Sequence, residues 1–413
     1  MKALQINISS VNARPHPSSL WLFPGLYLST ILLNQPNSLI GAIGQVIGWI
    51  NILAALHILI TNRWNKMLVI SLTLGLIISR MGRIVFAYDW IESMYTMILN
   101  AIYCFAGSVI VFKSINMLYK QVLWLALINF LFMILQVVGV GAWTQALSTY
   151  GEGNFAEPVT TLLVTAQDII HKSVQLRPAG ISYSTVILTI LILFGIILHY
   201  SRKQDRLRWG SIVLVGMVVF SMGKMVMIGF VMISLWIFLS GNSWQRKGVI
   251  HGVLLFVLII ALYKQLFPGL WEINTSSYTI STSFYLRLND IIRFLNPNGY
   301  LYNQGMYYLK NTASVTWIGH DQIVSGYSLI LSRSKALSGL LLGGFIAYVI
   351  GLRKLHKQYP ELTGEVVISM TIFLALPFMY SYWGVSLYWF MASIALQPIL
   401  MILMPGSFKY KLS

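Results

Sequence analysis

The chain consists of long apolar blocks separated by short polar segments, and this pattern predicts its secondary structure. Blocks of about 18 or more apolar residues are typical of helices that cross a membrane. We expect about twelve such helices in an all-α fold, a polytopic integral membrane helix bundle that forms a single domain over residues 1–413. The predicted spans are 19–34, 39–61, 67–87, 91–112, 122–141, 180–200, 209–221, 225–240, 248–264, 335–352, 366–381 and 385–404.

One apolar stretch, 209–240, is flanked by basic segments at both ends. A single crossing would place one basic segment outside, against the bias of Lys and Arg toward the cytoplasm. Two crossings with a turn near residues 221–224 keep both segments inside. Each half then rises only about 18–24 Å, against a hydrocarbon core of about 30 Å. Such short, Gly-interrupted helices are tolerated where they line a protein cavity.

Composition agrees with a membrane protein: 57% of the 413 residues are hydrophobic and only 9% are charged. Soluble domains average about 25% charged residues. The net charge of +17 follows from basic residues in short loops, so it indicates cytoplasmic loops rather than nucleic-acid binding. We expect both termini to be cytoplasmic in a bacterial inner membrane. The basic segments expected there contain Arg63 and Lys66, Lys113 and Lys120, Arg202 to Arg208, Arg246 and Lys247, Arg353 to Lys357, and Lys409 and Lys411.

Two long polar segments, 142–179 and 265–334, are expected outside the cytoplasm. The second is rich in aromatic and β-branched residues, which predicts an ordered lid with an amphipathic helix around 284–296. The sequence contains no phosphate-loop motif, no H-E-x-x-H, no C-x-x-C and no G-x-S-x-G. It therefore gives no case for a nucleotide, zinc or serine-hydrolase centre.

Several basic residues lie on the predicted outer side, where the positive-inside bias should deplete them. Arginine offers planar, bidentate donors that match a phosphate, so such a group could hold a lipid-linked diphosphate. Arg80 and Arg83 have an alternative role, reaching lipid headgroups from a helix end. For Arg293 and Arg333 the functional and structural interpretations are balanced, and Lys310 is better explained as a solvated surface residue. The whole set is Arg80, Arg83, Arg177, Lys224, Arg287, Arg293, Lys310 and Arg333.

Two further pairs could carry chemistry. His320 and Asp321 precede a predicted span. His320 could act as a general base with Asp321 as its partner, or it could have only a structural role. Asp89 and Glu92, in the first outer turn, could act as a base or hold a metal, or could cap the next helix.

Four passages, in this order, resemble the O-antigen polymerase and ligase superfamily, which comprises the Wzy-type polysaccharide polymerases and the WaaL-type ligases. They are LRPAGISYS from Leu176, FSMGK ending at Lys224, YLRL from Tyr285 followed by NPNGY, and GHDQ from Gly319 leading into Ser338-Gly339-Leu340. The likeness covers about residues 170–350. The third passage lacks the second glycine of the family's pattern, and Lys224 stands where many relatives carry arginine.

The resemblance implies a glycosyltransferase that moves a glycan from undecaprenyl diphosphate onto another lipid-linked repeat unit at the outer face of the membrane. In this reading Arg177 and Arg287 stabilise the leaving diphosphate together with Lys224, and His320 acts as base with Asp321. Arg80, Arg83, Arg293, Arg333 and Tyr285 are expected to bind substrate, although Tyr285 could equally pack the lid. Arginine clamps can replace a metal, so no cofactor is expected. Membrane lipid and a chain-length regulator protein are the expected partners.

Three alternatives remain open. The first is a WaaL-type ligase, and the long segment between His320 and Gly339 favours the polymerase over it. The second is a glycosyltransferase that uses Asp89 and Glu92. The third is a polysaccharide flippase or another transporter without enzymatic activity.

Overall fold

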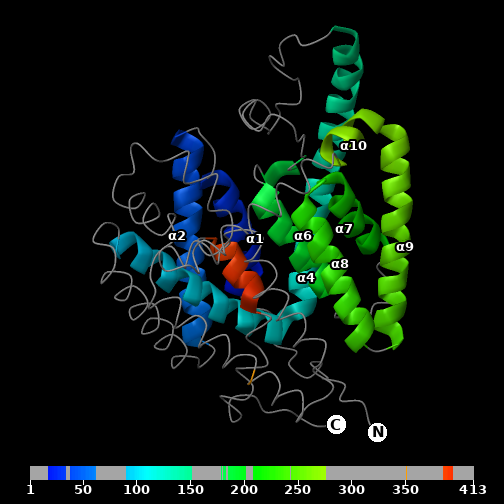
Figure 1. Ribbon diagram of the computed structural model, residues 1–413. Coiled ribbons are helices and arrows are strands. Elements are labelled where there is room, and N and C mark those ends of the chain that lie inside the picture. The colour runs from blue at the N-terminus through cyan, green and yellow to red at the C-terminus, as the bar shows by residue number, and fades with distance from the viewer. Residues whose placement is uncertain are drawn as a thin grey trace, which may run out of the picture. The chain divides into compact units, whose positions relative to one another are not determined.

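The computed structural model describes residues 17–33, 38–61, 90–150, 178, 180–182, 185–200, 208–241, 243–275, 350 and 385–393 (Figure 1). Within these ranges every regular element is a helix. The elements are α1 (Pro17–Leu33), α2 (Ser38–Thr61), α4 (Trp90–Tyr150), the 3₁₀ turn η2 (Gly180–Ser182), α6 (Thr185–Tyr200), α7 (Arg208–Phe220), α8 (Lys224–Ser240), α9 (Ser243–Leu266) and α10 (Pro268–Thr275). A further helical stretch covers 386–393.

Three helices in this part of the chain are long and apolar enough to cross a membrane: Leu39–Thr61, Asn116–Val138 and Ser243–Leu266. Shorter apolar helices accompany them. The predicted all-α class is therefore confirmed for the described residues, and the chain is a helical membrane protein. The total of about twelve spans stays a prediction, because spans such as 67–87 and 366–381 lie outside those residues.

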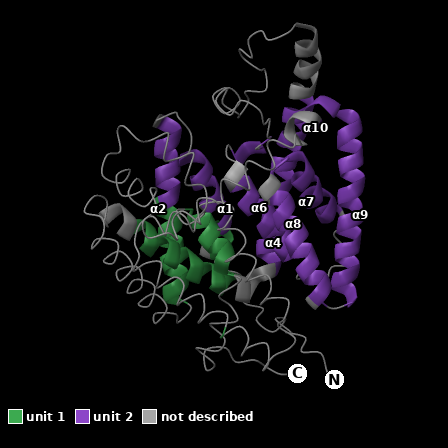
Figure 2. Cartoon of the chain, viewed as in Figure 1, with its two compact units in different colours: residues 1–22, 49–115, 282–413 green, residues 23–48, 116–281 purple. Residues whose placement is uncertain are grey.

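The chain divides into two compact units, which Figure 2 colours separately. Unit 1 comprises residues 1–22, 49–115 and 282–413, and unit 2 comprises 23–48 and 116–281. Each unit is assembled from segments that are distant in sequence. The single domain expected over 1–413 stays a prediction, and each unit is described by itself below.

One predicted loop is absent. We expected Lys113 and Lys120 to flank a loop between two spans, but the backbone is helical through this region as part of α4. Helix also continues over 142–150, which we had placed in an outer loop. The physical reason is that no proline or glycine lies between 113 and 120. A local polar segment without a breaker does not end a helix.

In unit 1, the stretch 386–393 packs closely against the first part of α4. A side chain added at Gly107 would meet Ser393 Oγ at 2.8 Å and the Phe390 ring at 3.2 Å. Two hydrogen bonds join the same elements: Ser108 Oγ donates to the Ser393 carbonyl at 3.2 Å, and Ser386 Oγ donates to Asn100 Oδ1 at 2.9 Å. A small residue at the crossing point thus brings the two helices close enough for polar contacts between them.

In unit 2, α6 is the central helix. Its residues from Ile187 to Leu198 are all buried. Other helices pack on it from several sides, as the ring contact between Phe23 and Phe194 at 5.4 Å illustrates. A helix that is apolar around its whole circumference is stable only when neighbours surround it in this way. The composition of TVILTILILFGIILHY therefore explains the position of α6.

The predicted break between residues 221 and 224 is confirmed, because α7 ends at Phe220 and α8 begins at Lys224. The chain also reverses there. α7 begins beside the end of α6, where His199 Nε2 lies 2.6 Å from Ser211 Oγ. It ends beside Tyr263, near the end of α9. α8 then returns to Gly241, immediately before α9 begins.

This reversal gives unit 2 two distinct ends. At the basic end lie Tyr200, Ser211, Gly241 and Gly248; the Tyr200 ring lies against Gly248, 3.8 Å from an added Cβ. The basic segments around 201–208 and 246–247 adjoin this end along the chain. Arg246 stabilises the end of α8, donating from Nε to the Gly241 carbonyl at 3.0 Å. Both flanks of the 209–240 stretch therefore lie at one end of the bundle, as the charge pattern predicts.

Candidate functional site

The opposite end of unit 2, which we call the motif end, contains parts of two of the four passages quoted above. It comprises η2, the turn at 221–223, Gln136 with Val137 of α4, and Tyr263 of α9 with α10. The LRPAGISYS passage enters this end through Pro178, which is buried, and η2. FSMGK supplies the turn between α7 and α8.

Gln136 holds the start of the first passage. Its Nε2 donates to the Gly180 carbonyl at 3.2 Å, and its Oε1 accepts from the Gly180 backbone N–H at 3.0 Å. The amide thus satisfies both backbone groups of one residue. Buried backbone groups outside a regular helix need such partners, since leaving them unpaired inside a bundle is costly. This pair of bonds fixes the path of the chain just after Arg177.

A second polar group fixes the end of η2. Ser182 Oγ donates to Asn129 Oδ1 at 2.8 Å, Asn129 Nδ2 donates to Tyr27 Oη at 2.8 Å, and Tyr27 Oη lies 2.5 Å from Ser182 Oγ. All three residues are fully buried. A closed ring of hydrogen bonds in a low-dielectric interior stabilises one geometry, because breaking any member leaves unpaired polar atoms. The ring joins α1, α4 and η2.

Gly180 is the residue that this arrangement requires to be glycine. Its φ is +60°, in the left-handed region. An added Cβ would meet Asn129 Oδ1 at 2.8 Å and the Asn129 carbonyl oxygen at 2.9 Å. Both the backbone conformation and the space therefore exclude a side chain.

We expect Gly180→Ala to lower the stability of the protein by about 2 kcal/mol, since it combines a strained φ with a clash. Thermal unfolding of the detergent-purified protein measures this loss. Gly41→Ala is the matched control, because nothing lies within 4 Å of an added Cβ there. That change in α2 should be neutral or slightly stabilising. Equal melting temperatures for the Gly180 variant and the wild type would contradict the proposed fit.

The turn between α7 and α8 has an unusual backbone. Met222 has a φ of +44°, which is uncommon for a residue other than glycine. Ser221 supports the turn: its Oγ donates to the Val218 carbonyl at 3.0 Å and accepts from the Gly223 N–H at 3.3 Å. Met222 itself is buried. Packing around Met222 thus compensates for a conformation that costs free energy locally.

α8 begins without a side-chain cap. Gly223 occupies the N-cap position and no side chain bonds to the first turn. The first N–H groups of a helix have no intrahelical acceptor, and the macrodipole places partial positive charge there. Lys224 is the first residue of this helix. The local chemistry at the start of α8 therefore suits an anion.

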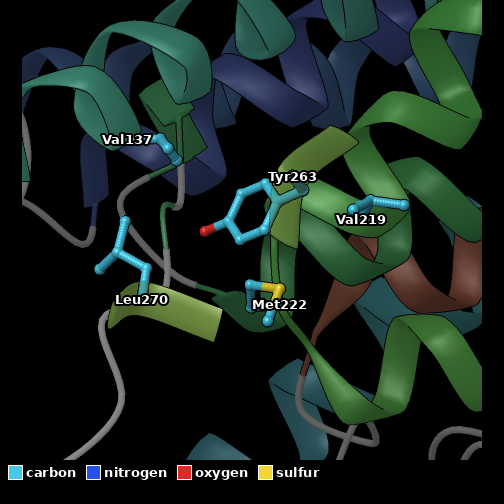
Figure 3. Packing of buried hydrophobic residues seen from close by; sticks show 5 residues of the cluster. All are labelled: Val137, Val219, Met222, Tyr263 and Leu270. Atoms are coloured by element: carbon cyan, nitrogen blue, oxygen red, sulfur yellow. The ribbon is translucent and has the colours of Figure 1, made fainter. Parts of the chain in front are cut away.

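An apolar cluster connects the parts of the motif end (Figure 3). It consists of Val137, Val219, Met222, Tyr263 and Leu270. These residues come from α4, α7, the turn, α9 and α10. Phe220 packs edge-on against Tyr263, with ring centroids 5.3 Å apart. The cluster joins the turn before Lys224 to the helix that carries Gln136.

Most predicted site residues lie outside the described residues, and their roles stay predictions. These are Arg80, Arg83, Arg177, Tyr285, Arg287, Arg293, His320, Asp321 and Arg333; Lys310 and the alternative candidate Asp89 also lie outside those residues. The backbone of Lys224 is described. In the described ranges no three His, Cys, Asp or Glu side chains gather as metal ligands.

Sequence reasoning missed Tyr27, Asn129 and Gln136. The available signal was their polarity within apolar blocks, because polar side chains in membrane helices face the protein interior and make hydrogen bonds. No sequence pattern indicates that all three make hydrogen bonds to the LRPAGISYS passage.

Comparison with known proteins yields no match to a protein-family model, to a curated protein or to a solved structure. The candidate site is therefore defined by its own residues and by their arrangement.

Proposed function

We propose that this chain is a Wzy-type polymerase of a surface polysaccharide. It would transfer a glycan chain from undecaprenyl diphosphate onto the non-reducing end of another lipid-linked repeat unit. The reaction takes place at the outer face of a bacterial inner membrane, and the chain crosses that membrane about twelve times. Undecaprenyl diphosphate is the leaving group, so cations must stabilise the charge that develops on it.

The observation that carries the proposal is that two of the four family-like passages meet at the motif end of unit 2. Gly180 of the first passage and Gly223 of the second are 43 residues apart in sequence, yet the cluster and the Gln136 bonds join the two passages through α4. The reversal between α6 and α7 by itself places both passages at one end of unit 2, and the contacts add that both pack on the same stretch of α4, at Gln136 and Val137.

The sidedness of unit 2 gives further support. The motif end lies opposite the basic end, to which the segments 201–208 and 246–247 adjoin. If those basic segments are cytoplasmic, the motif end faces outward. That is the side on which a polymerase of this class would meet its substrate.

The local chemistry of the motif end also fits an anionic substrate. The uncapped start of α8 with Lys224 offers positive charge. Arg177 is joined by a peptide bond to Pro178, in the segment that Gln136 anchors. In the proposed reaction these two cations hold the diphosphate with Arg287, and His320 with Asp321 activates the acceptor hydroxyl.

Loss of the gene tests this proposal directly. A polymerase-deficient strain should accumulate single repeat units on undecaprenyl diphosphate, or single units on the final acceptor. The measurement is extraction of lipid-linked glycans, with determination of their length and of the leaflet that contains them.

Two other results would each replace the proposal with a specific alternative. Full-length polymer on the lipid carrier would identify a ligase. Single units confined to the cytoplasmic leaflet would identify a flippase. Expression of the intact chain from a plasmid is the control, and it must restore the normal products.

A further inference from the structure

Tyr263 has a buried hydroxyl that no group in the described ranges of the chain satisfies. The residue is 1% exposed, and its Oη has no hydrogen-bond partner. Burying a hydroxyl without a partner costs free energy, whereas phenylalanine would fill the same volume without that cost. An unpaired buried donor therefore requires an explanation. The described residues contain other buried side-chain atoms of this kind, in Asn51 and Ser393 of unit 1 and in Gln121 and Ser234 of unit 2, but of these residues only Tyr263 belongs to the cluster at the motif end.

The surroundings of Tyr263 are apolar. Figure 3 shows the hydroxyl directed toward Val137 and Leu270 and away from Val219. The ring packs against Phe220 and against Phe267, with centroids 5.3 and 5.4 Å away. These contacts fix the position of the ring. The hydroxyl oxygen itself lies between α4 and α10, where no described group forms a hydrogen bond with it.

The location of this hydroxyl connects it with the candidate site. Its ring shares a cluster with Met222, two residues before Lys224 in the turn that leads into α8. On its other side lies Val137, next to the Gln136 side chain that holds Gly180. Tyr263 thus stands between the two passages that contribute cations to the proposed reaction.

We infer that the Tyr263 hydroxyl donates a hydrogen bond to a phosphate oxygen of the polyprenyl diphosphate carrier when that substrate is bound. This inference rests on the proposed function. A charged oxygen is the favoured acceptor, because hydrogen bonds to ionised groups are stronger than those between neutral groups. The anion-favouring start of α8 comes two residues after Met222, which belongs to the same cluster as Tyr263.

A substrate oxygen reaches this hydroxyl only when α10 shifts. Leu270 covers the cluster and is itself buried. Helix α10 follows α9 after a single non-helical residue, Phe267, and belongs to the cluster through apolar contacts. The apolar contacts of Leu270 in the cluster are non-directional, so they can be exchanged for others when the short helix shifts about Phe267. In the absence of substrate α10 then covers the polar atom.

Tyr263→Phe tests the inference, because it removes one oxygen and keeps the ring. The full-length protein is purified in detergent and titrated with undecaprenyl diphosphate alone as the probe. We expect about tenfold weaker binding, the effect of losing one hydrogen bond to a charged group. Thermal stability should be unchanged or higher, since an unpaired buried hydroxyl is gone. A purely structural tyrosine would show no loss of affinity.

Tyr119→Phe is the matched control at the basic end. The Tyr119 hydroxyl lies 2.6 Å from His199 Nδ1, so its removal breaks a bond within the protein. That variant should melt at a lower temperature and bind the probe like the wild type. Weaker probe binding without loss of stability in Tyr263→Phe, and loss of stability without weaker binding in Tyr119→Phe, would separate ligand binding from packing.

The outcomes separate the inference from the proposed function. If the wild type binds the probe and Tyr263→Phe binds it equally well, the phosphate contact is wrong and the polymerase proposal stands. The phosphate contact is also wrong if Tyr263→Phe binds the probe normally and impairs only the transfer of glycan to the acceptor sugar. If the wild type does not bind the probe and loss of the gene leaves lipid-linked glycans unchanged, the proposed function itself fails.

Discussion

Replacing His320 by alanine is expected to slow glycan transfer about 10²- to 10⁴-fold, the contribution of a positioned general base. This corresponds to roughly 3–5 kcal/mol of activation free energy. The acceptor hydroxyl must lose its proton as it attacks the sugar carbon that bears the diphosphate. Without a base the bound donor persists, so binding of the lipid-linked donor should be unaffected. Single repeat units should therefore accumulate on the carrier.

The measurement combines two readouts: the length of lipid-linked glycans in cells, and binding of undecaprenyl diphosphate to the purified variant. His251→Ala is the control, because this exposed histidine of α9 lies toward the basic end. It should leave both readouts unchanged. A normal distribution of products from His320→Ala would assign His320 a structural role.

Replacing Arg177 by alanine should abolish polymer while the amount of protein in the membrane stays the same. Removing one donor that stabilises developing charge typically costs about 10²- to 10³-fold in rate. The structure strengthens this expectation through the residues that follow Arg177. Buried hydrogen bonds hold the backbone there in one position. They are made by Gln136 and by the ring of Tyr27, Asn129 and Ser182. A fixed backbone limits the conformations of an adjacent side chain and so favours a defined phosphate contact.

Arg177→Lys should rescue poorly, because a point charge does not reproduce bidentate phosphate geometry. Arg287→Ala should behave like Arg177→Ala. The control is Arg246→Ala at the basic end, which removes a bond to the Gly241 carbonyl but should keep polymer production. Quantifying polymer and membrane protein in each strain distinguishes these cases. Full polymer from Arg177→Ala would remove Arg177 from the site, and normal polymer from both arginine variants would leave the clamp without support.

Much of unit 2 could be predicted from the sequence. The bounds of α1, α2, α7 and α8 fall within one or two residues of the predicted spans. The break at 221–223 followed from charge alone, since basic segments on both sides of one apolar stretch require two crossings. Membrane helices are predictable in this way because the bilayer imposes their length and demands that every backbone group be paired within the helix.

The prediction failed where two spans continue into each other. The segment from Lys113 to Lys120 contains charge but no helix breaker, and α4 passes through it. Polarity alone indicates where a helix leaves the membrane and does not indicate where it ends. Termination needs a proline, a glycine or a cap.

What the sequence by itself determined is therefore local: an all-helical chain, its basic segments and the short hairpin of α7 and α8. The tertiary structure decided which polar residues meet. Gln136 bonds Gly180 across 44 positions, and Tyr27 bonds Ser182 across 155. The Tyr263 hydroxyl has no hydrogen-bond partner in the described part of the chain. Hydrogen bonds depend on positions in space, and a hydrophobic pattern specifies only which face of a helix is buried, so these contacts emerge only when the helices are packed.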